Sequence, residues 1–275
     1  MKKRGILLFF SIFVVCALGA QTFEWGVRYL GGASTLMGDD DSYLLRFDLE
    51  DSEGYHGYLQ AESDPVSMGY AQGFGLYMME RLSKKVDSLW LQGEFLWQRY
   101  SFSFDYEGKG IDTDNPVLGT ALPATLTGSI CHSAEYISIP LLFKMRQEIS
   151  TGLGNDQFQG AYVYMGPALS FLLKQSYEYK DGVKDLRDSI QDYVDANPGM
   201  SSQRSKYGAD YLLSHKVDIV VGTGFQLKDV FKLGLGSDTF SIDLRADISI
   251  LNQGRADAGK EFRLVSGMLS LGYKF

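Results

Sequence analysis

Long runs of two-residue alternation constrain this chain more than any other feature of its sequence. Between Phe240 and Ile250 every even position is apolar, while Asp243, Arg245 and Asp247 lie among the odd positions. Successive side chains of a β-strand point to opposite faces, so this run predicts a strand with one apolar and one charged face. It is longer than the ~5–6 residues of a typical soluble strand and matches the ~9–11 residues of a strand that crosses a membrane.

The same pattern recurs along the chain, which predicts eight strands. They cover Phe23–Tyr29, Ser67–Leu82, Leu89–Gln98, Ile137–Arg146, Ala161–Lys174, Leu213–Gln226, Phe240–Ile250 and Phe262–Phe275. Short connections alternate with longer ones, as in membrane barrels that have short turns at one end and long loops at the other. The predicted fold class is therefore all-β: an eight-stranded antiparallel up-and-down transmembrane β-barrel. Residues Tyr43–Glu62 also alternate, and both a projecting hairpin and two further strands of a ten-stranded barrel remain open.

The first twenty residues have the pattern of a signal peptide. Three basic residues precede the apolar stretch Ile6–Val15, and small residues follow it. The stretch is shorter than the ~20 residues of a membrane-spanning helix, although a short anchor and lipid attachment at Cys16 are alternatives. Cleavage after Ala20 or after Gly19 fits about equally well. Residues 1–20 are thus predicted to direct export to a bacterial outer membrane, and residues 21–275 to form the barrel domain.

Composition excludes several other classes of protein. The formal net charge is -8, with 26 Lys+Arg against 34 Asp+Glu, which argues against a nucleic-acid partner. Two cysteines cannot build a disulfide scaffold or a four-cysteine zinc site. If Cys16 leaves with the signal peptide, Cys131 remains alone, and we expect it to be a free thiol.

Two of the predicted outer loops are long and distinctive. Residues 37–66 (loop 1) contain nine acidic residues and one basic residue, Arg46. Residues 177–209 (loop 3) contain a helical pattern at Leu186, Ile190 and Val194, which Asn197-Pro198-Gly199 should end. An extracellular partner would meet the protein through loops 1 and 3.

Four segments of the chain resemble a known family. They are Tyr136–Lys144 (YISIPLLFK), Tyr164–Leu172 (YMGPALSFL), Val220–Phe225 (VVGTGF) and Leu271–Phe275 (LGYKF). The chain resembles the PorT-like outer-membrane β-barrel domain family over about residues 22–275. This resemblance implies a single eight-stranded barrel in an outer membrane. Phe275, with Tyr273 two positions before it, resembles the terminal signal that the barrel assembly machinery reads. Loop 1 is longer and more acidic than the family pattern, so no loop function carries over.

The charges on the polar faces of the predicted strands form the main candidate site. There are five acidic and seven basic residues: Glu24, Arg28, Glu94, Lys144, Arg146, Lys174, Lys216, Asp218, Asp243, Arg245, Asp247 and Lys274. Facing lipid, a midplane Arg or Lys would cost ~2–4 kcal/mol. Facing the lumen of an eight-stranded barrel, these residues can pair and fill the interior. We predict an internal salt-bridge network, with a narrow gated conduit as the alternative.

Three smaller motifs carry weaker signals. His132-Ser133 beside Glu135 resembles the His-Ser pair of small outer-membrane lipid A deacylases, but an ordinary loop histidine is the simpler expectation. Asp39–Asp41 could bind a divalent cation, although a solvated acidic loop explains them as well. Gly222-Thr223-Gly224 does not lead into a helix and is expected to allow close strand packing. No metal, cofactor or catalytic residue is predicted.

These expectations favour a non-enzymatic integral outer-membrane protein with a charge-plugged lumen and acidic surface loops. Its predicted partners are outer-membrane lipid and the barrel assembly machinery, and its predicted role at the cell surface is structural or adhesive. Three alternatives remain: a narrow channel or transporter for small solutes or apolar molecules, an enzyme acting on lipids, and an accessory component of a secretion system.

Overall fold

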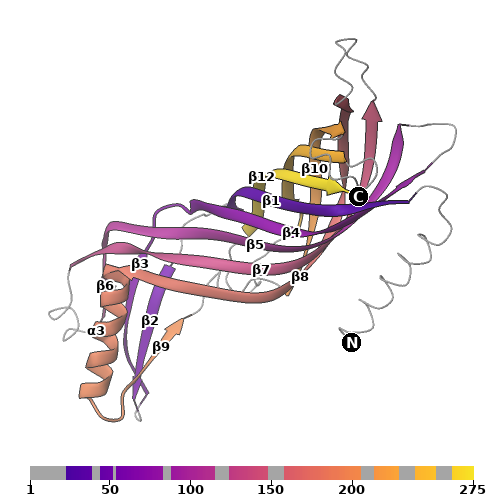
Figure 1. The fold of residues 1–275 in the computed structure, drawn as a ribbon. Coiled ribbons are helices and arrows are strands. Elements are labelled where there is room, and N and C mark those ends of the chain that lie inside the picture. The colour runs from indigo at the N-terminus through magenta and orange to yellow at the C-terminus, as the bar shows by residue number, and fades with distance from the viewer. Residues whose placement is uncertain are drawn as a thin grey trace.

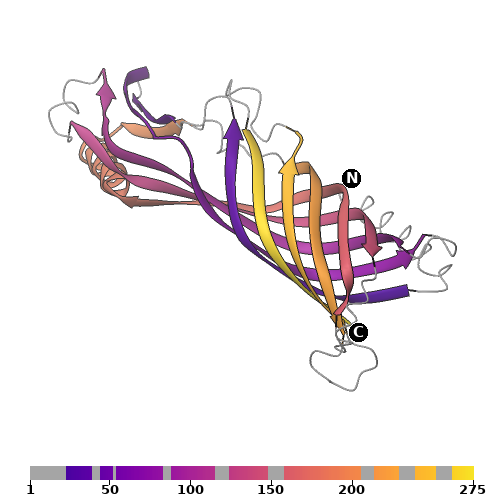
Figure 2. The ribbon, with the colours of Figure 1, turned by 90° about the horizontal axis from the view of Figure 1, so that it is seen from above.

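Eight antiparallel strands close into a barrel, which confirms the predicted fold class (Figures 1 and 2). The computed structural model describes residues 23–38, 44–51, 54–82, 88–114, 124–147, 158–205, 214–228, 239–251 and 262–275. The barrel strands are β1 (Phe23–Gly38), β4 (Ser67–Arg81), β5 (Leu89–Gly110), β7 (Thr125–Gln147), β8 (Phe158–Asp181), β10 (His215–Lys228), β11 (Thr239–Ser249) and β12 (Phe262–Lys274). The ring closes because β1 pairs with both β12 and β4.

Several predicted features lie outside the described residues. They include the signal peptide at residues 1–20, Asp39–Asp41 in loop 1, and most of the three short connections that follow β4, β7 and β10. No helix in the described part of the chain is long and apolar enough to cross a membrane.

The outer surface of the barrel is apolar. Large outward side chains include Trp25 (49% exposed), Phe74 (59%), Met165 (59%) and Leu244 (65%). The intervening inward positions are buried and polar, as in β11, where Asp243 is fully buried next to Leu244. An apolar surface to which all the barrel strands contribute is too large to be exposed to water, because exposed apolar patches on soluble proteins are small. The barrel is therefore a membrane-spanning one, with a polar interior.

The polarity of the two faces inverts along three strands, and the inversion marks the upper edge of the apolar belt. On β5 the inward polar residues Gln92, Glu94 and Gln98 are followed by the inward aromatic residues Tyr100, Phe102, Phe104 and Tyr106. On the outward face of the same strand, the apolar Phe95 and Trp97 are followed by the polar Arg99, Ser101 and Ser103. On β7 the outward residues change from apolar to polar between Ile137 and Glu135. On β8 the same change falls between Leu173 and Lys174. Beyond this edge the wall meets water, and its inner face becomes a hydrophobic core.

That core belongs to a head built on the extended strands β5, β7 and β8, at the end of the barrel opposite the short connections (Figure 1). A second sheet in the order β6-β3-β2-β9 is formed by β6 (Asp112–Thr113), β3 (Gly54–Glu62), β2 (Leu44–Asp51) and β9 (Ser201–Ser205). The helix α3 (Gly182–Ala196) follows β8 directly. Buried residues of the head include Leu45, Phe47 and Leu49 of β2, Leu59 of β3, Phe102 and Phe104 of β5, and Leu126 and Ile130 of β7.

The structure of the head decides two predictions about the loops. Residues 44–62 form a projecting hairpin, so the ten-stranded barrel is wrong: β2 and β3 pair with each other in the second sheet and not with the ring. The helical pattern in loop 3 is confirmed, because α3 buries Val183, Leu186 and Ile190 along one face. Loops 1 and 3 also meet directly, since β2 pairs with β9 from Arg46–Ser205 to Glu50–Ser201.

Candidate functional site

The lumen contains an ion-pair network centred on Glu94. This carboxylate accepts from Arg28 and from Arg245, each at 2.5 Å, and joins strands β1, β5 and β11 across the interior. Arg28 also lies 3.0 Å from a carboxylate oxygen of Asp243, and Arg245 donates through Nε to Asp247 at 2.6 Å. All five side chains are at most 3% exposed. The network is therefore sealed from solvent, and each charge in it has an opposite charge in contact.

Neutral side chains add two hydrogen bonds to the network. Gln92 donates to Glu94 at 2.5 Å, and Gln98 donates to Asp247 at 3.0 Å. Charges in a medium of low dielectric constant need such additional hydrogen bonds, because their mutual attraction alone rarely offsets desolvation.

A second cluster closes the lumen just below the head. Lys216 forms an ion pair with Asp218, which also accepts from Ser249 at 2.6 Å. The ammonium of Lys216 lies 4.7 Å from the ring centroid of Tyr100 and 5.2 Å from that of Tyr136. Both tyrosines belong to the head core, so the polar lumen passes directly into a packed aromatic layer.

The remaining predicted charges lie toward the end with the short connections. Lys274 pairs with Glu24 at 3.0 Å near the rim, where the Glu24 side chain is 25% exposed. Lys144 is buried over the ring of Tyr162, with Nζ 3.5 Å from the ring centroid, and Arg146 lies half-buried on the same inward face.

Lys174 does not belong to the lumen, which corrects the prediction for this residue. The pairing of β7 with β8 shifts between Tyr136–Leu172 and Glu135–Lys174, leaving Leu173 without a direct partner. One extra residue in a strand reverses which face the following side chains occupy. Lys174 is consequently exposed on the outer wall, opposite Glu135.

We expect the folded protein to give no steady current in a planar bilayer. Most of the charges and the tyrosines described above are buried along the lumen, and an eight-stranded barrel has little interior space beyond its side chains. The measurement is single-channel recording of the reconstituted protein under a range of voltages. Large, stable openings would contradict the plugged lumen and favour the conduit.

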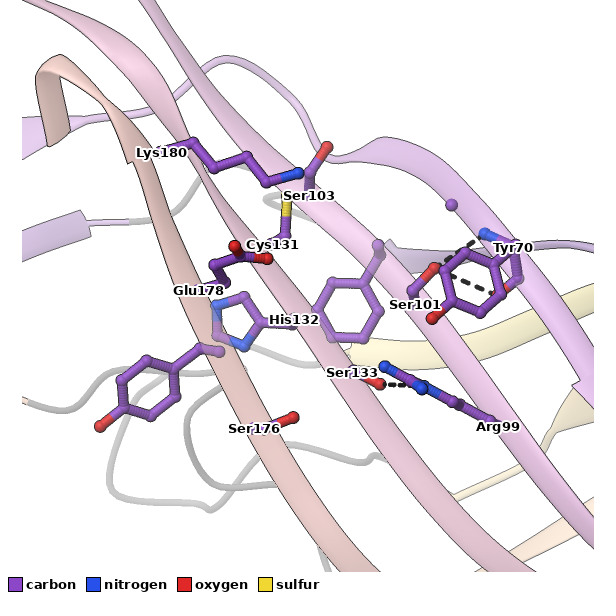
Figure 3. Close-up of a pocket in the computed structure, with 13 residues that line it drawn as sticks. Tyr70, Arg99, Ser101, Ser103, Cys131, His132, Ser133, Ser176, Glu178 and Lys180 are labelled. Carbon is purple, nitrogen blue, oxygen red and sulfur yellow. Dashed lines mark hydrogen bonds between the residues drawn. The ribbon is translucent and has the colours of Figure 1, made fainter. Parts of the chain in front are cut away.

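A groove of about 330 Å³ lies on the outer wall of the extended strands (Figure 3). Arg99 lies at one end and donates through Nε to Ser133 at 2.8 Å. Cys131, Glu178 and Lys180 lie toward the other end. The pKa of Lys180 is raised, first by the adjacent Cys131 sulfur and then by the carboxylate of Glu178.

The smaller motifs have structural places. His132 is 1% exposed and lies inside β7, not in a loop as expected, with its ring stacked on Phe102 at 5.3 Å. Cys131 is a free cysteine, as predicted. A Cβ on Gly222 would lie 2.3 Å from the Tyr164 ring, so this glycine allows close packing inside the barrel. The residues that the structure describes contain no cluster of three or more His, Cys, Asp or Glu that could hold a metal.

The fold and the lumen define a class: an eight-stranded membrane-spanning β-barrel with a plugged interior and a folded head. No family model matches the chain, so the PorT-like resemblance remains a prediction. No curated protein matches it either.

Similar solved structures include outer-membrane proteins. OprG of Pseudomonas aeruginosa has 12% identity and a TM-score of 0.31, covering 93% of this chain and 99% of its own. Ail of Yersinia pestis, solved with the heparin analogue sucrose octasulfate, has 14% identity and a TM-score of 0.28, covering 91% and 99%. The outer membrane protease OmpT of Escherichia coli has 9% identity and a TM-score of 0.36, covering 94% and 99%. Scores this low transfer no function to this chain.

Proposed function

We propose that this chain is a non-enzymatic integral outer-membrane protein whose plugged barrel anchors a surface head for structural or adhesive contacts. The observation that carries the proposal is the continuity of β5, β7 and β8, which leave the apolar belt and become the floor of a head whose hydrophobic core continues that of the upper barrel. A barrel that served only to conduct solutes would not need such a structure.

The orientation follows from the predicted export signal and from the layout of the strands. Phe23 and Phe275 lie at the end of the short connections, because β1 begins opposite Glu80 at the end of β4 and Phe275 donates to the carbonyl of Trp25. Outer-membrane barrels keep short turns in the periplasm and long loops outside. The head then faces the exterior.

The lumen supports a structural role for the barrel. Its arginines and carboxylates bind one another, and its upper end is occupied by Lys216 between two tyrosine rings. Groups that are already paired and buried are poorly placed to bind a solute. The barrel is therefore an anchor in this proposal, and the working surface is the head, where loops 1 and 3 combine.

Adherence of whole cells tests this proposal. Cells that display the full chain should bind matrix-coated or epithelial surfaces better than cells with an empty vector. Replacing residues 44–62 by a short Gly-Ser linker removes β2 and β3, which are not part of the ring, and should abolish the gain. Equal adherence of all three strains would contradict the adhesive role, while solute-dependent swelling of liposomes containing the protein would favour a channel.

A further inference from the structure

The groove on the outer wall begins where the apolar belt ends. Arg99 follows the lipid-facing Trp97 on β5, and the groove continues from it toward the head through Ser101 and Ser103. The four residue steps from Arg99 to Ser103 span about 13 Å along the strand, and a strand tilt of about 40° makes this about 10 Å along the membrane normal. The polar layer on each side of a bilayer is about 5–7 Å thick. The end of the groove at Arg99 thus lies at the depth of lipid head groups, and the end at Lys180 lies beyond them.

Arg99 is held as an anion-binding residue would be. Its Nε bonds Ser133, and the Tyr70 ring lies 5.6 Å from the guanidinium carbon. Within the described residues, no hydrogen bond or ion pair uses its two terminal amino groups. A guanidinium fixed at Nε and at one face presents those amino groups as a ready pair of donors for phosphate oxygens.

A row of hydroxyls crosses the wall one residue pair beyond Arg99, whose own direct partner on β7 is the half-buried, outward Glu135. Ser101, Ser133 and Ser176 are direct partners in the β5–β7 and β7–β8 pairings, so their side chains lie on one face. Ser101 is engaged with the Tyr70 backbone, whereas Ser176 is exposed. Lys180 supplies a second cation at the far end, with Glu178 as the acidic group between. The groove therefore combines a cation at each end with a row of hydroxyls and one carboxylate, which lies near Lys180 and away from Arg99.

We propose that this groove binds the phosphate of a membrane lipid head group, with Arg99 as the main contact and the acyl chains on the apolar belt below. The inference rests on the membrane placement of the barrel. A soluble anion could use the same donors, but the groove opens at the edge of the belt, where a lipid phosphate is held by its own chains. The phosphate oxygens would accept from Arg99 and from Ser176.

Cys131 lines the groove and provides a local reporter. With Cys16→Ser, the chain carries a single thiol, whose reaction with a polar maleimide can be timed in nanodiscs. In discs containing phosphatidylglycerol the reaction should be about tenfold slower than in discs of uncharged galactosyl diacylglycerol, because a phosphate held by the charged donor Arg99 would keep the rest of the lipid head group in the groove, over the thiol.

Two variants distinguish phosphate binding in the groove from a general attraction of anionic lipid to the cations at the edge of the apolar belt. Arg99→Gln should remove the protection by phosphatidylglycerol. Lys174→Gln removes a cation at the same edge of the belt but outside the groove, and should leave the protection intact.

Four results would overturn the proposal. They are equal reaction rates in both lipids, protection that survives Arg99→Gln, equal loss in both variants, and full protection by inorganic phosphate in galactosyl discs. A chain that fails to enter the discs at all would instead contradict the membrane placement, and the site with it.

Discussion

Glu94→Ala should lower the free energy of unfolding by about 3–5 kcal/mol, the usual loss when one partner of a buried ion pair is removed. Glu94 is the shared acceptor of Arg28 and Arg245, and its side chain is fully buried. Without it, the two guanidiniums face each other across the lumen, with only Asp243 and Asp247 left to balance them. Both guanidiniums are at most 3% exposed, so the excess charge would be poorly solvated.

The measurement is reversible unfolding of the barrel in lipid vesicles by guanidinium chloride. Glu24→Ala is the matched control, because Glu24 also pairs with a cation but lies at the partly exposed rim. The Lys274 side chain is 9% exposed and that of Glu24 is 25% exposed, so this variant should lose more than the about 0–1 kcal/mol of an exposed pair but clearly less than Glu94→Ala. Losses of similar size in the two variants would show that water reaches the centre of the lumen.

Phe104→Ala should destabilise the head by about 3–5 kcal/mol and leave the barrel in the membrane. Phe104 is fully buried in the head core, with its ring edge-on to Phe102 at 5.9 Å and to His132 at 5.5 Å. Removing the ring opens a cavity between its neighbours on β5 and β7. The ion pairs of the lumen lie below this layer and keep their partners.

Surface proteolysis and hydrogen exchange on intact vesicles measure this effect. Fragments should appear from residues 44–62 and 182–205, while the barrel strands stay protected. Phe143→Ala removes the same ring from a lipid-facing position that is 50% exposed, and should leave head proteolysis unchanged. Loss of protection in the barrel and the head together would contradict the separate stability of the two regions.

The sequence predicts the ring of eight strands because each membrane crossing repeats the same apolar-out, polar-in alternation. It predicts the extended strands poorly, although the signal is present: Tyr100, Phe102, Phe104 and Tyr106 alternate with polar residues just beyond Gln98. The faces exchange polarity there, so the run no longer matches a membrane strand and was expected to be a loop. Continued alternation with inverted polarity could have revealed the head.

For the candidate site, the sequence predicts which face of each strand carries the charges, but not which charges pair with each other. Alternation predicts all twelve charges on the inward side, and the structure places eleven of them there. The prediction is wrong for Lys174, because a register shift cannot be seen in one strand alone. The pairing of Glu94 with Arg245 joins residues 151 positions apart, and it depends on how the barrel closes. The groove at Arg99 depends in the same way on three strands lying side by side.

The unbroken passage of β5, β7 and β8 from barrel to head also has a mechanical consequence. A load applied to the head runs along the strands, while the hydrogen bonds between antiparallel strands run across them. Such a load must shear many bonds at once and cannot open them one by one from an end. Drag on the head would therefore be transmitted to the barrel and the bilayer through three continuous strands that contain no hinge.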